Sequence, residues 1–260
     1  MAKAIVAIGG GAIKPGGTEA IDREVIRLSH KKHPRVLFIP TASSDDGPFC
    51  RRFRDYFGGF LGCLTDTLLL VNERPPARQM ERQILAADIV YVGGGNTLFM
   101  MRLWRRLGVD RILKRAYERG IILSGISAGA ICWFESGHSD SMSFYQPQDW
   151  KYINVRGLGL IPGVHCPHYN GRTRGVPRRK NFQEMIGTIG GVGIAIENHC
   201  AIEFIDGQAY RVITAKPRAR AYRVYKSGGL VVSEQIPKQE QLAPVGRLAE
   251  GGGDSAGRTG

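Results

Sequence analysis

The sequence of 260 residues predicts a doubly wound α/β fold of three layers, in which a mainly parallel sheet lies between helices. Short runs that are apolar throughout recur along the chain, as in strands that are buried on both faces. Segments with helical spacing of apolar residues separate these runs, so right-handed crossovers would place helices on both faces of the sheet. Ligands of such sheets bind at the carboxyl ends of the strands.

The predicted elements follow one another in a regular order. Strand-length runs are AIVAIG (4–9), RVLFIP (35–40), DTLLLV (66–71), DIVYVG (88–93) and GIILSG (120–125). Helical patterns cover TEAIDREVIRLSHKKH (18–33) and NTLFMMRLWRRLGVDRILKRAYERG (96–120). After about residue 190, the runs GVGIAIEN, CAIEFIDG, QAYRVIT, RAYRVYKSG and GLVVSEQI alternate with turn residues. They predict an antiparallel extension of the same sheet.

Length and composition predict one domain over residues 1–235, because 43% hydrophobic residues suffice for one core. Residues 236–260, which include LAPVGRLAEGGGDSAGRTG, are rich in glycine and polar residues, so we expect a disordered tail. No apolar run approaches the roughly 18 residues of a membrane helix, and the N-terminus lacks the length of a secretory signal. These features predict a soluble, cytoplasmic protein without a membrane partner.

The formal net charge of +13 raises the question of nucleic-acid binding. Basic residues are scattered over RRFRDYF, LWRRLGVDRILKRAYER, GRTRGVPRRK and KPRARAYR, with acidic residues interleaved in several of them. Such mixed patterning is typical of a solvated surface, so no nucleic-acid partner is expected. The five cysteines are an odd number at wide spacing, which favours free thiols in a reducing compartment.

The stretch GIILSGISAGAICWF joins a predicted strand to a predicted helix. In its centre, Gly125, Ser127 and Gly129 form a Gly-x-Ser-x-Gly pattern. A serine on such a turn projects above the sheet, and small neighbours are needed because the backbone is strained and crowded. Ser127 is therefore a candidate nucleophile, with a helix N-cap as the alternative role.

A second glycine cluster, Gly93 to Gly95, follows the strand DIVYV and precedes a helix, so it should lie at the same sheet edge. Its backbone N–H groups could hold an oxyanion or a phosphate, although the Lys-Ser/Thr of a P-loop is missing. Asn96 could contact substrate or cap the helix. The loop GGGAIKPGG has no dinucleotide-binding pattern and is interpreted as a connection.

A serine nucleophile needs a base and a group that orients the base. His168 in LGLIPGVHCPHYN falls at a strand end and is the preferred base, with His165 second. Glu197 at the end of GVGIAIEN is the preferred acid, with rivals Glu135, Asp140 and Glu203. A metal site around His165, Cys166 and His168 is the alternative, but the spacing fits no familiar pattern, so neither metal nor cofactor is expected.

The motifs VGGGNT, GISAGA, GLGLIPGVHCPHY and GIAIEN, in this order, resemble the serine peptidase family of dipeptidase E (the aspartyl dipeptidase) and cyanophycinase. The resemblance runs from about residue 4 to about residue 225. It implies a flavodoxin-like fold related to class I glutamine amidotransferases. It assigns Ser127 as nucleophile, His168 as its histidine and the loop of Gly93 to Gly95 as oxyanion loop.

The resemblance also implies a short peptide as substrate, hydrolysed through an acyl-enzyme. The oxyanion would be held by Ala128 N–H together with Gly94 or Gly95 N–H. Dipeptidase E prefers an N-terminal aspartate, for which Arg172 and Arg174 could supply the cation. A homodimer is a further option.

Two other functions remain open at this point. A cyanophycinase-like exopeptidase would attack β-linked Asp-Arg units. An amidotransferase-like binding module would carry the serine without catalysis.

Overall fold

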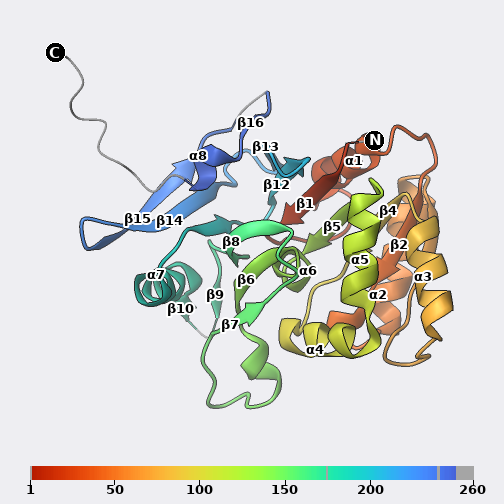
Figure 1. Cartoon of the computed structure of the whole chain (residues 1–260), viewed down its shortest axis with the longest axis horizontal. Coiled ribbons are helices and arrows are strands. Elements are labelled where there is room, and N and C mark those ends of the chain that lie inside the picture. The colour runs from red at the N-terminus through yellow and green to blue at the C-terminus, as the bar shows by residue number, and fades with distance from the viewer. Residues whose placement is uncertain (1, 174, 239–240, 250–260) are drawn as a thin grey trace.

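The computed structural model describes residues 2–173, 175–238 and 241–249, and it contains two sheets with helices around them (Figure 1). The first sheet has the strand order β16-β13-β12-β1-β5-β4-β2-β3. Its parallel part consists of β1 (Ala4–Ile8), β5 (Ile122–Ile126), β4 (Ile89–Val92), β2 (Arg35–Ile39) and β3 (Leu64–Thr67). Four of these strands match the predicted runs closely, whereas β3 begins and ends earlier than the run at 66–71.

Helices cover both faces of this sheet, which confirms the α/β sandwich. One face packs on α1 (Glu19–Leu28), α2 (Gly47–Arg54) and the π-helical turn η2 (Asp55–Phe60). The other face packs on α3 (Ala77–Ala86), α4 (Thr97–Leu107) and α5 (Val109–Glu118). The helical pattern predicted over 96–120 is two helices, because Gly108 adopts a left-handed conformation with φ of 76° and ends α4.

The antiparallel extension of the first sheet contains β12 (Cys200–Ile205), β13 (Ala209–Thr214) and β16 (Ala243–Pro244). The prediction of disorder from residue 236 onward is wrong for residues 241–249. Within this range, Ala243 and Pro244 form β16 and the last four residues form α8 (Gly246–Ala249), and Ala243 and Leu248 supply apolar side chains that are buried in the core. Ile236 is likewise buried in the core, at the end of the strand Leu230–Ile236. Residues 250–260 of the predicted tail lie outside the described residues.

The prediction of one extended sheet needs a correction, because part of the C-terminal region belongs to a second sheet of order β15-β14-β11-β8-β6-β7. This sheet contains β11 (Gly193–Ile196), β14 (Ala221–Ser227) and β15 (Leu230–Ile236), together with β6 (Phe134–Ser139), β7 (Ile153–Arg156) and β8 (Ile161–Cys166). One face joins the main core and the other packs on α7 (Arg178–Ile189). Shorter elements are the 3₁₀ turns η1 (Thr41–Ser43) and η3 (Ser141–Phe144), with β9 (Arg172–Thr173) and β10 (Val176–Pro177).

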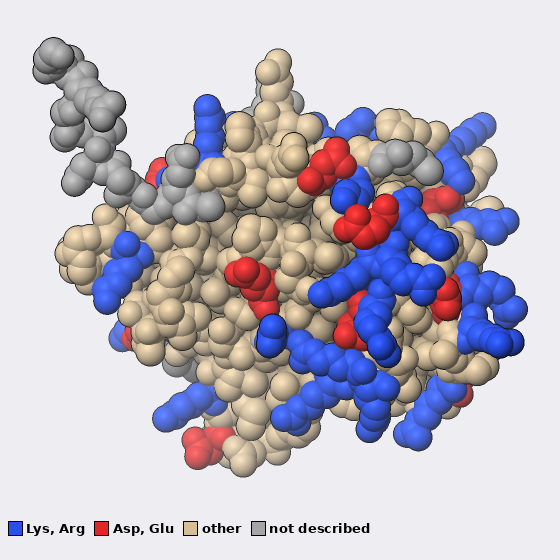
Figure 2. All heavy atoms as spheres, in the orientation of Figure 1, with Lys and Arg blue, Asp and Glu red and all other residues tan. Residues whose placement is uncertain are grey.

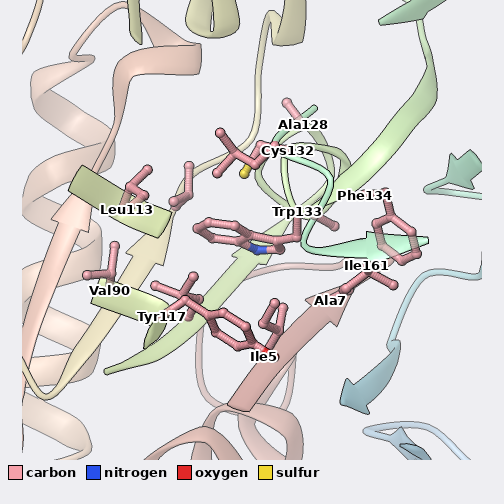
Figure 3. Packing of buried hydrophobic residues seen from close by; sticks show 14 of the residues in the cluster. Ile5, Ala7, Val90, Leu113, Tyr117, Ala128, Cys132, Trp133, Phe134 and Ile161 are labelled. Atoms are coloured by element: carbon pink, nitrogen blue, oxygen red, sulfur yellow. The ribbon is translucent and has the colours of Figure 1, made fainter. Parts of the chain in front are cut away.

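The main core lies between the two sheets and around α6 (Ala128–Ile131), the short helix that follows β5. Figure 3 shows the Trp133 indole among Leu113, Tyr117 and Ile5. Because burial of a large side chain stabilises the fold by roughly 2 to 3 kcal/mol, Trp133 holds the end of α6 against the sheet. This packing fixes the turn between β5 and α6, where the site lies.

Among the described residues, no helix has both the length and the apolar character that a membrane span requires.

Candidate active site

Ser127 occupies a strained turn between β5 and α6. Its φ of 58° and ψ of −115° are rarely adopted by residues other than glycine. A Cβ atom added at Gly125 would lie 2.4 Å from Gly129 O, and one added at Gly129 would lie 2.4 Å from Val92 O. Glycine is therefore required at both positions of the pattern, because a larger side chain would clash with the neighbouring backbone. Ser127 makes no side-chain cap to α6, so its hydroxyl is available to other groups.

His168 lies beside this hydroxyl. Its Nε2 atom is 2.8 Å from Ser127 Oγ, which is a hydrogen-bonding distance. The histidine follows β8 in the second sheet, whereas the serine follows β5 in the first. Adjacent carbonyls at the end of β1 hold both residues, because Ser127 N–H donates to Ile8 O (3.0 Å) and His168 N–H donates to Gly9 O (2.9 Å). The structure therefore brings together the predicted nucleophile and base.

Asn198 is the third residue of the hydrogen-bonded series, and its Oδ1 lies 2.6 Å from His168 Nδ1. An amide oxygen accepts, so Nδ1 carries the proton and Nε2 presents its lone pair to the Ser127 hydroxyl. Asn170 Oδ1 accepts from Asn198 N–H at 3.0 Å and fixes the asparagine backbone. Serine, histidine and asparagine are thus joined by two hydrogen bonds.

The predicted acid Glu197 does not contact His168 in this arrangement. Its carboxylate accepts from Arg220 N–H (2.9 Å) and from the Tyr222 hydroxyl (3.4 Å), and it lies 3.7 Å from the Arg179 guanidinium. The prediction failed because β11 ends at Ile196 and the next two side chains diverge, so that the asparagine, not the glutamate, meets the histidine. Asparagine as orienting group occurs in papain-like proteases, and this precedent could have drawn attention to the second residue of the pair Glu-Asn.

The rival acids are engaged elsewhere. Glu135 accepts from Gly163 N–H, Asp140 pairs with Arg178, and Glu203 pairs with Arg211. Within the described residues, none of these three carboxylates forms a hydrogen bond or an ion pair with His168. Among the described residues, the side chain hydrogen-bonded to His168 Nδ1 is therefore an amide.

The glycine-rich loop after β1, interpreted from sequence as a simple connection, lines the site. A Cβ atom added at Gly10 would lie 2.2 Å from Asn198 Oδ1 and 2.3 Å from His168 Nδ1. Only glycine leaves room for that hydrogen bond. The signal in the sequence was the run of three glycines directly after a central strand, at the edge where ligands bind.

The predicted oxyanion groups lie close to the serine. A Cβ atom at Gly94 would stand 3.2 Å from Ser127 Cβ, so the loop between β4 and α4 passes beside the nucleophile. Gly95 is crowded against Ala42 O. Ala128 N–H is in the first turn of α6, where N–H groups have no acceptor within the helix. Asn96 caps α4, since its Oδ1 accepts from Phe99 N–H at 3.0 Å.

The electrostatics of the site keep the histidine neutral. Burial lowers the pKa of His168 from its usual value, and the nearby Arg178 guanidinium lowers this pKa further. Arg178 begins α7, is almost fully buried, and pairs with Asp140 at 2.6 Å. Arg172 is exposed and donates to Gly175 O, and Arg174 lies outside the described residues.

The other histidines have separate surroundings. His165 is fully buried, its Nδ1 lies 2.9 Å from Ile194 O, and its ring stacks on Phe134, so it does not serve Ser127. His138 Nε2 lies 2.9 Å from Asn181 Oδ1. In the part of the chain that the structure describes, no group of three or more His, Cys, Asp or Glu side chains could hold a metal ion.

Known proteins resemble this chain in sequence and in fold. Over 238 residues it is 35% identical to the uncharacterized peptidase YgaJ of Bacillus subtilis strain 168, over 90% of this chain and 97% of that one. It is 28% identical over 136 residues to Peptidase E of Streptomyces coelicolor, over 52% of this chain and 51% of that protein. A solved peptidase from an acI-B1 Actinobacterium has the same fold, with a TM-score of 0.72, 17% identity and coverage of 94% and 97%.

These likenesses define the protein as a serine-type peptidase. The chain belongs to Peptidase family S51, whose pattern matches residues 5–212. The family expected from the Ser-Ala-Gly and Pro-His motifs is thereby confirmed, as is the fold class that it implied.

Proposed function

We propose that this protein hydrolyses short peptides through a Ser127–His168–Asn198 triad and an acyl-enzyme. The observation that carries the proposal is the pair of hydrogen bonds that meet at His168, 2.8 Å to the serine and 2.6 Å to the asparagine. A positioned base within such a distance is what activates a serine hydroxyl.

In the first half of the reaction, His168 Nε2 takes the Ser127 proton while Oγ attacks the peptide carbonyl. Asn198 Oδ1 keeps the ring in the productive tautomer and accepts from the Nδ1–H of the imidazolium. Ala128 N–H and an N–H of Gly94 or Gly95 stabilise the oxyanion, each donor contributing roughly 3 to 4 kcal/mol. The imidazolium then protonates the leaving amine.

In the second half, His168 deprotonates a water molecule that attacks the acyl-enzyme, and the serine leaves with the returned proton. The lowered pKa of His168 supports both halves, because the neutral base predominates near neutral pH. An asparagine adds no negative charge to the site, so the imidazolium receives only dipolar stabilisation from this side.

An acidic first residue is the finer part of the proposal. Arg178 carries five N–H donors, of which one bonds Asp140 Oδ2, and its charge is felt at His168. In the low dielectric around an almost fully buried guanidinium, the attraction for a substrate carboxylate would be stronger than at the exposed Arg172. Arg178 therefore replaces the loop arginines as the proposed cation.

The test is hydrolysis of Asp-Leu, Asn-Leu, Ala-Leu and β-Asp-Arg by the wild type, by Ser127→Ala and by His168→Ala. We expect kcat/KM for Asp-Leu to exceed that for Asn-Leu, because the two differ in charge but hardly in shape. Both variants should lose turnover to a similar extent, by about 10⁴-fold or more, since the two side chains act as one unit.

Two outcomes would contradict separate parts of the proposal. Retained turnover in Ser127→Ala would remove the serine mechanism. Equal rates for Asp-Leu and Asn-Leu would remove the acidic preference and leave the triad standing. Thermal unfolding of both variants near the wild-type Tm would show that lost turnover is chemical and not structural.

A further inference from the structure

The fold gathers basic residues that are scattered in the sequence. Figure 2 shows Lys and Arg side chains concentrated over the part of the molecule that Figure 1 assigns to α3, α4 and α5. We call the exposed cations of these helices and of the residue after α5 the basic face. Its members are Arg78, Arg82, Arg102, Arg105, Arg106, Arg111, Lys114, Arg115 and Arg119. Helix spacing puts them on the solvent side because the opposite side of each helix packs on the sheet.

Most of these charges are not balanced by neighbouring acids. The three helices contain only the acids Glu81, Asp110 and Glu118. Glu81 pairs with Arg115 at 2.7 Å, and Glu118 pairs with Lys3 at 3.0 Å. For the other members of the basic face, no ion pair occurs within the described ranges, which leaves a strong positive potential on one side of the molecule.

The exposed apolar and aromatic side chains of the molecule indicate which kind of anionic partner can bind to the basic face. A helix that lies on a lipid surface needs exposed apolar side chains, and a single-stranded nucleic acid needs exposed aromatic rings on which its bases stack. Within the described residues, the large apolar side chains that are exposed are Phe60, Leu64, Phe144, Tyr145, Ile189, Leu230 and Leu242. All lie outside α3, α4 and α5, so none of these exposed apolar or aromatic side chains belongs to the helices of the basic face.

Although the scattered basic residues of the sequence predict no nucleic-acid partner, their clustering in the fold reverses this expectation, and we propose that the basic face binds the phosphate backbone of double-stranded nucleic acid without reading its sequence. Arginine is well suited to this role, because its planar guanidinium donates two parallel hydrogen bonds to a phosphate. The α5 helix has 10 residues and contacts both α3 and α4. At about 1.5 Å per residue its length is roughly 15 Å, along which a duplex presents about nine phosphate charges. Several contacts can thus form at once.

The test is binding of a labelled DNA duplex of about 20 base pairs to the full chain, measured by fluorescence anisotropy between about 50 and 200 mM NaCl. We expect Kd in the micromolar range at low salt and a steep linear fall of log K with log salt. Changing Arg102, Arg106, Arg111 and Lys114 to Gln should weaken binding at least tenfold. It should also reduce the slope by about 3 to 4, since each lost phosphate contact removes about 0.9.

A matched variant distinguishes the effect of the basic face from the effect of the net charge of the protein. Replacing the exposed Lys32, Arg51, Lys216 and Arg218 by Gln removes the same four charges elsewhere and should leave most of the binding intact. Equal loss in both variants would overturn the proposal, and so would the absence of salt-dependent binding by the wild type. Tighter binding to a single strand or to phosphatidylserine vesicles would also overturn it. A Tm close to that of the wild type confirms that each variant is folded.

Discussion

Asn198 is the residue whose chemistry most affects the proposed reaction. As a neutral acceptor 2.6 Å from His168 Nδ1, it fixes the ring without adding charge to a buried site. The pKa of His168 therefore stays below its usual value, because burial and Arg178 both disfavour the imidazolium. We expect kcat/KM to be constant near neutral pH and to fall only as the pH drops below about 6.5.

Replacing Asn198 by Asp should move this acid limb to higher pH by about 1 to 3 pH units, because a carboxylate within 4 Å favours the protonated histidine. Asn198→Ala should lower kcat by roughly 10- to 100-fold, as the loss of a hydrogen bond of about 1 to 3 kcal/mol would do. The measurement is the pH dependence of kcat/KM for the three proteins. An acid limb that stays in place in Asn198→Asp would show that the asparagine does not orient the base.

At this scale the sequence predicted the serine and the histidine but not their partner. Ser127 and His168 are marked by local patterns, since a tight elbow needs glycines and a strand end exposes the next side chains. The partner of His168 depends on which way two consecutive residues point after β11. This direction is set by tertiary contacts such as Asn170 to Asn198 and Arg220 to Glu197, which no local pattern encodes.

Among the elements, the end of β1 has the most direct influence on the site. Its last carbonyls hold the backbone of Ser127 and of His168, and the following Gly10 packs against the His168–Asn198 hydrogen bond. The central place of β1, between β5 and β12, makes this strand end rigid.

We therefore predict that Gly10→Ala lowers kcat at least tenfold. The added methyl group would lie 2.2 Å from Asn198 Oδ1, so one of the two side chains must move. Gly59→Ala is the control, because no atom lies within 4 Å of its added Cβ. Steady-state kinetics and Tm of both variants are the measurement. A kcat within about twofold of the wild type in Gly10→Ala would refute the steric argument.

Element types were predicted better than their pairing. Every strand run named after residue 190 is a strand, yet only CAIEFIDG and QAYRVIT extend the first sheet. Alternation of apolar and polar residues identifies a half-buried strand but does not specify its neighbour. The second sheet forms because β8 pairs with β11 and β6, which are separated from β8 by other elements of the chain.

Across the whole molecule, buried titratable groups make the free energy of unfolding depend on pH. Two buried histidines and a buried aspartate do so in opposite directions. Burial lowers the pKa of His138 to about 4 and that of His165 to about 3. Both stay neutral in the fold while the unfolded chain takes up protons near pH 6.5, so their contribution is lost as the pH falls below that value. Asp22 behaves in the opposite way, since burial raises its pKa to about 7. Its favourable contribution is present at low pH and is lost as the pH rises toward 7.

The variant Asp22→Asn should separate these effects. Asn cannot ionise, so the free energy of unfolding of the variant minus that of the wild type should increase from about pH 4 to about pH 7 and then level off. Urea unfolding at several pH values provides the measurement. A difference that is the same at every pH would mean that the carboxyl group, which accepts from Thr18 (2.7 Å) and Tyr56 (3.1 Å), does not titrate in this range.

The two backbone hydrogen bonds at the end of β1, to Ser127 and to His168, also indicate where the chain can accept an insertion. Ser127 and His168 are separated by 41 positions, but Ile8 and Gly9 hold them through adjacent carbonyls. Their spacing is therefore independent of the length of the path between them. Residues 145–149, which are all exposed on that path, are the place where an insertion would leave the serine and the histidine together.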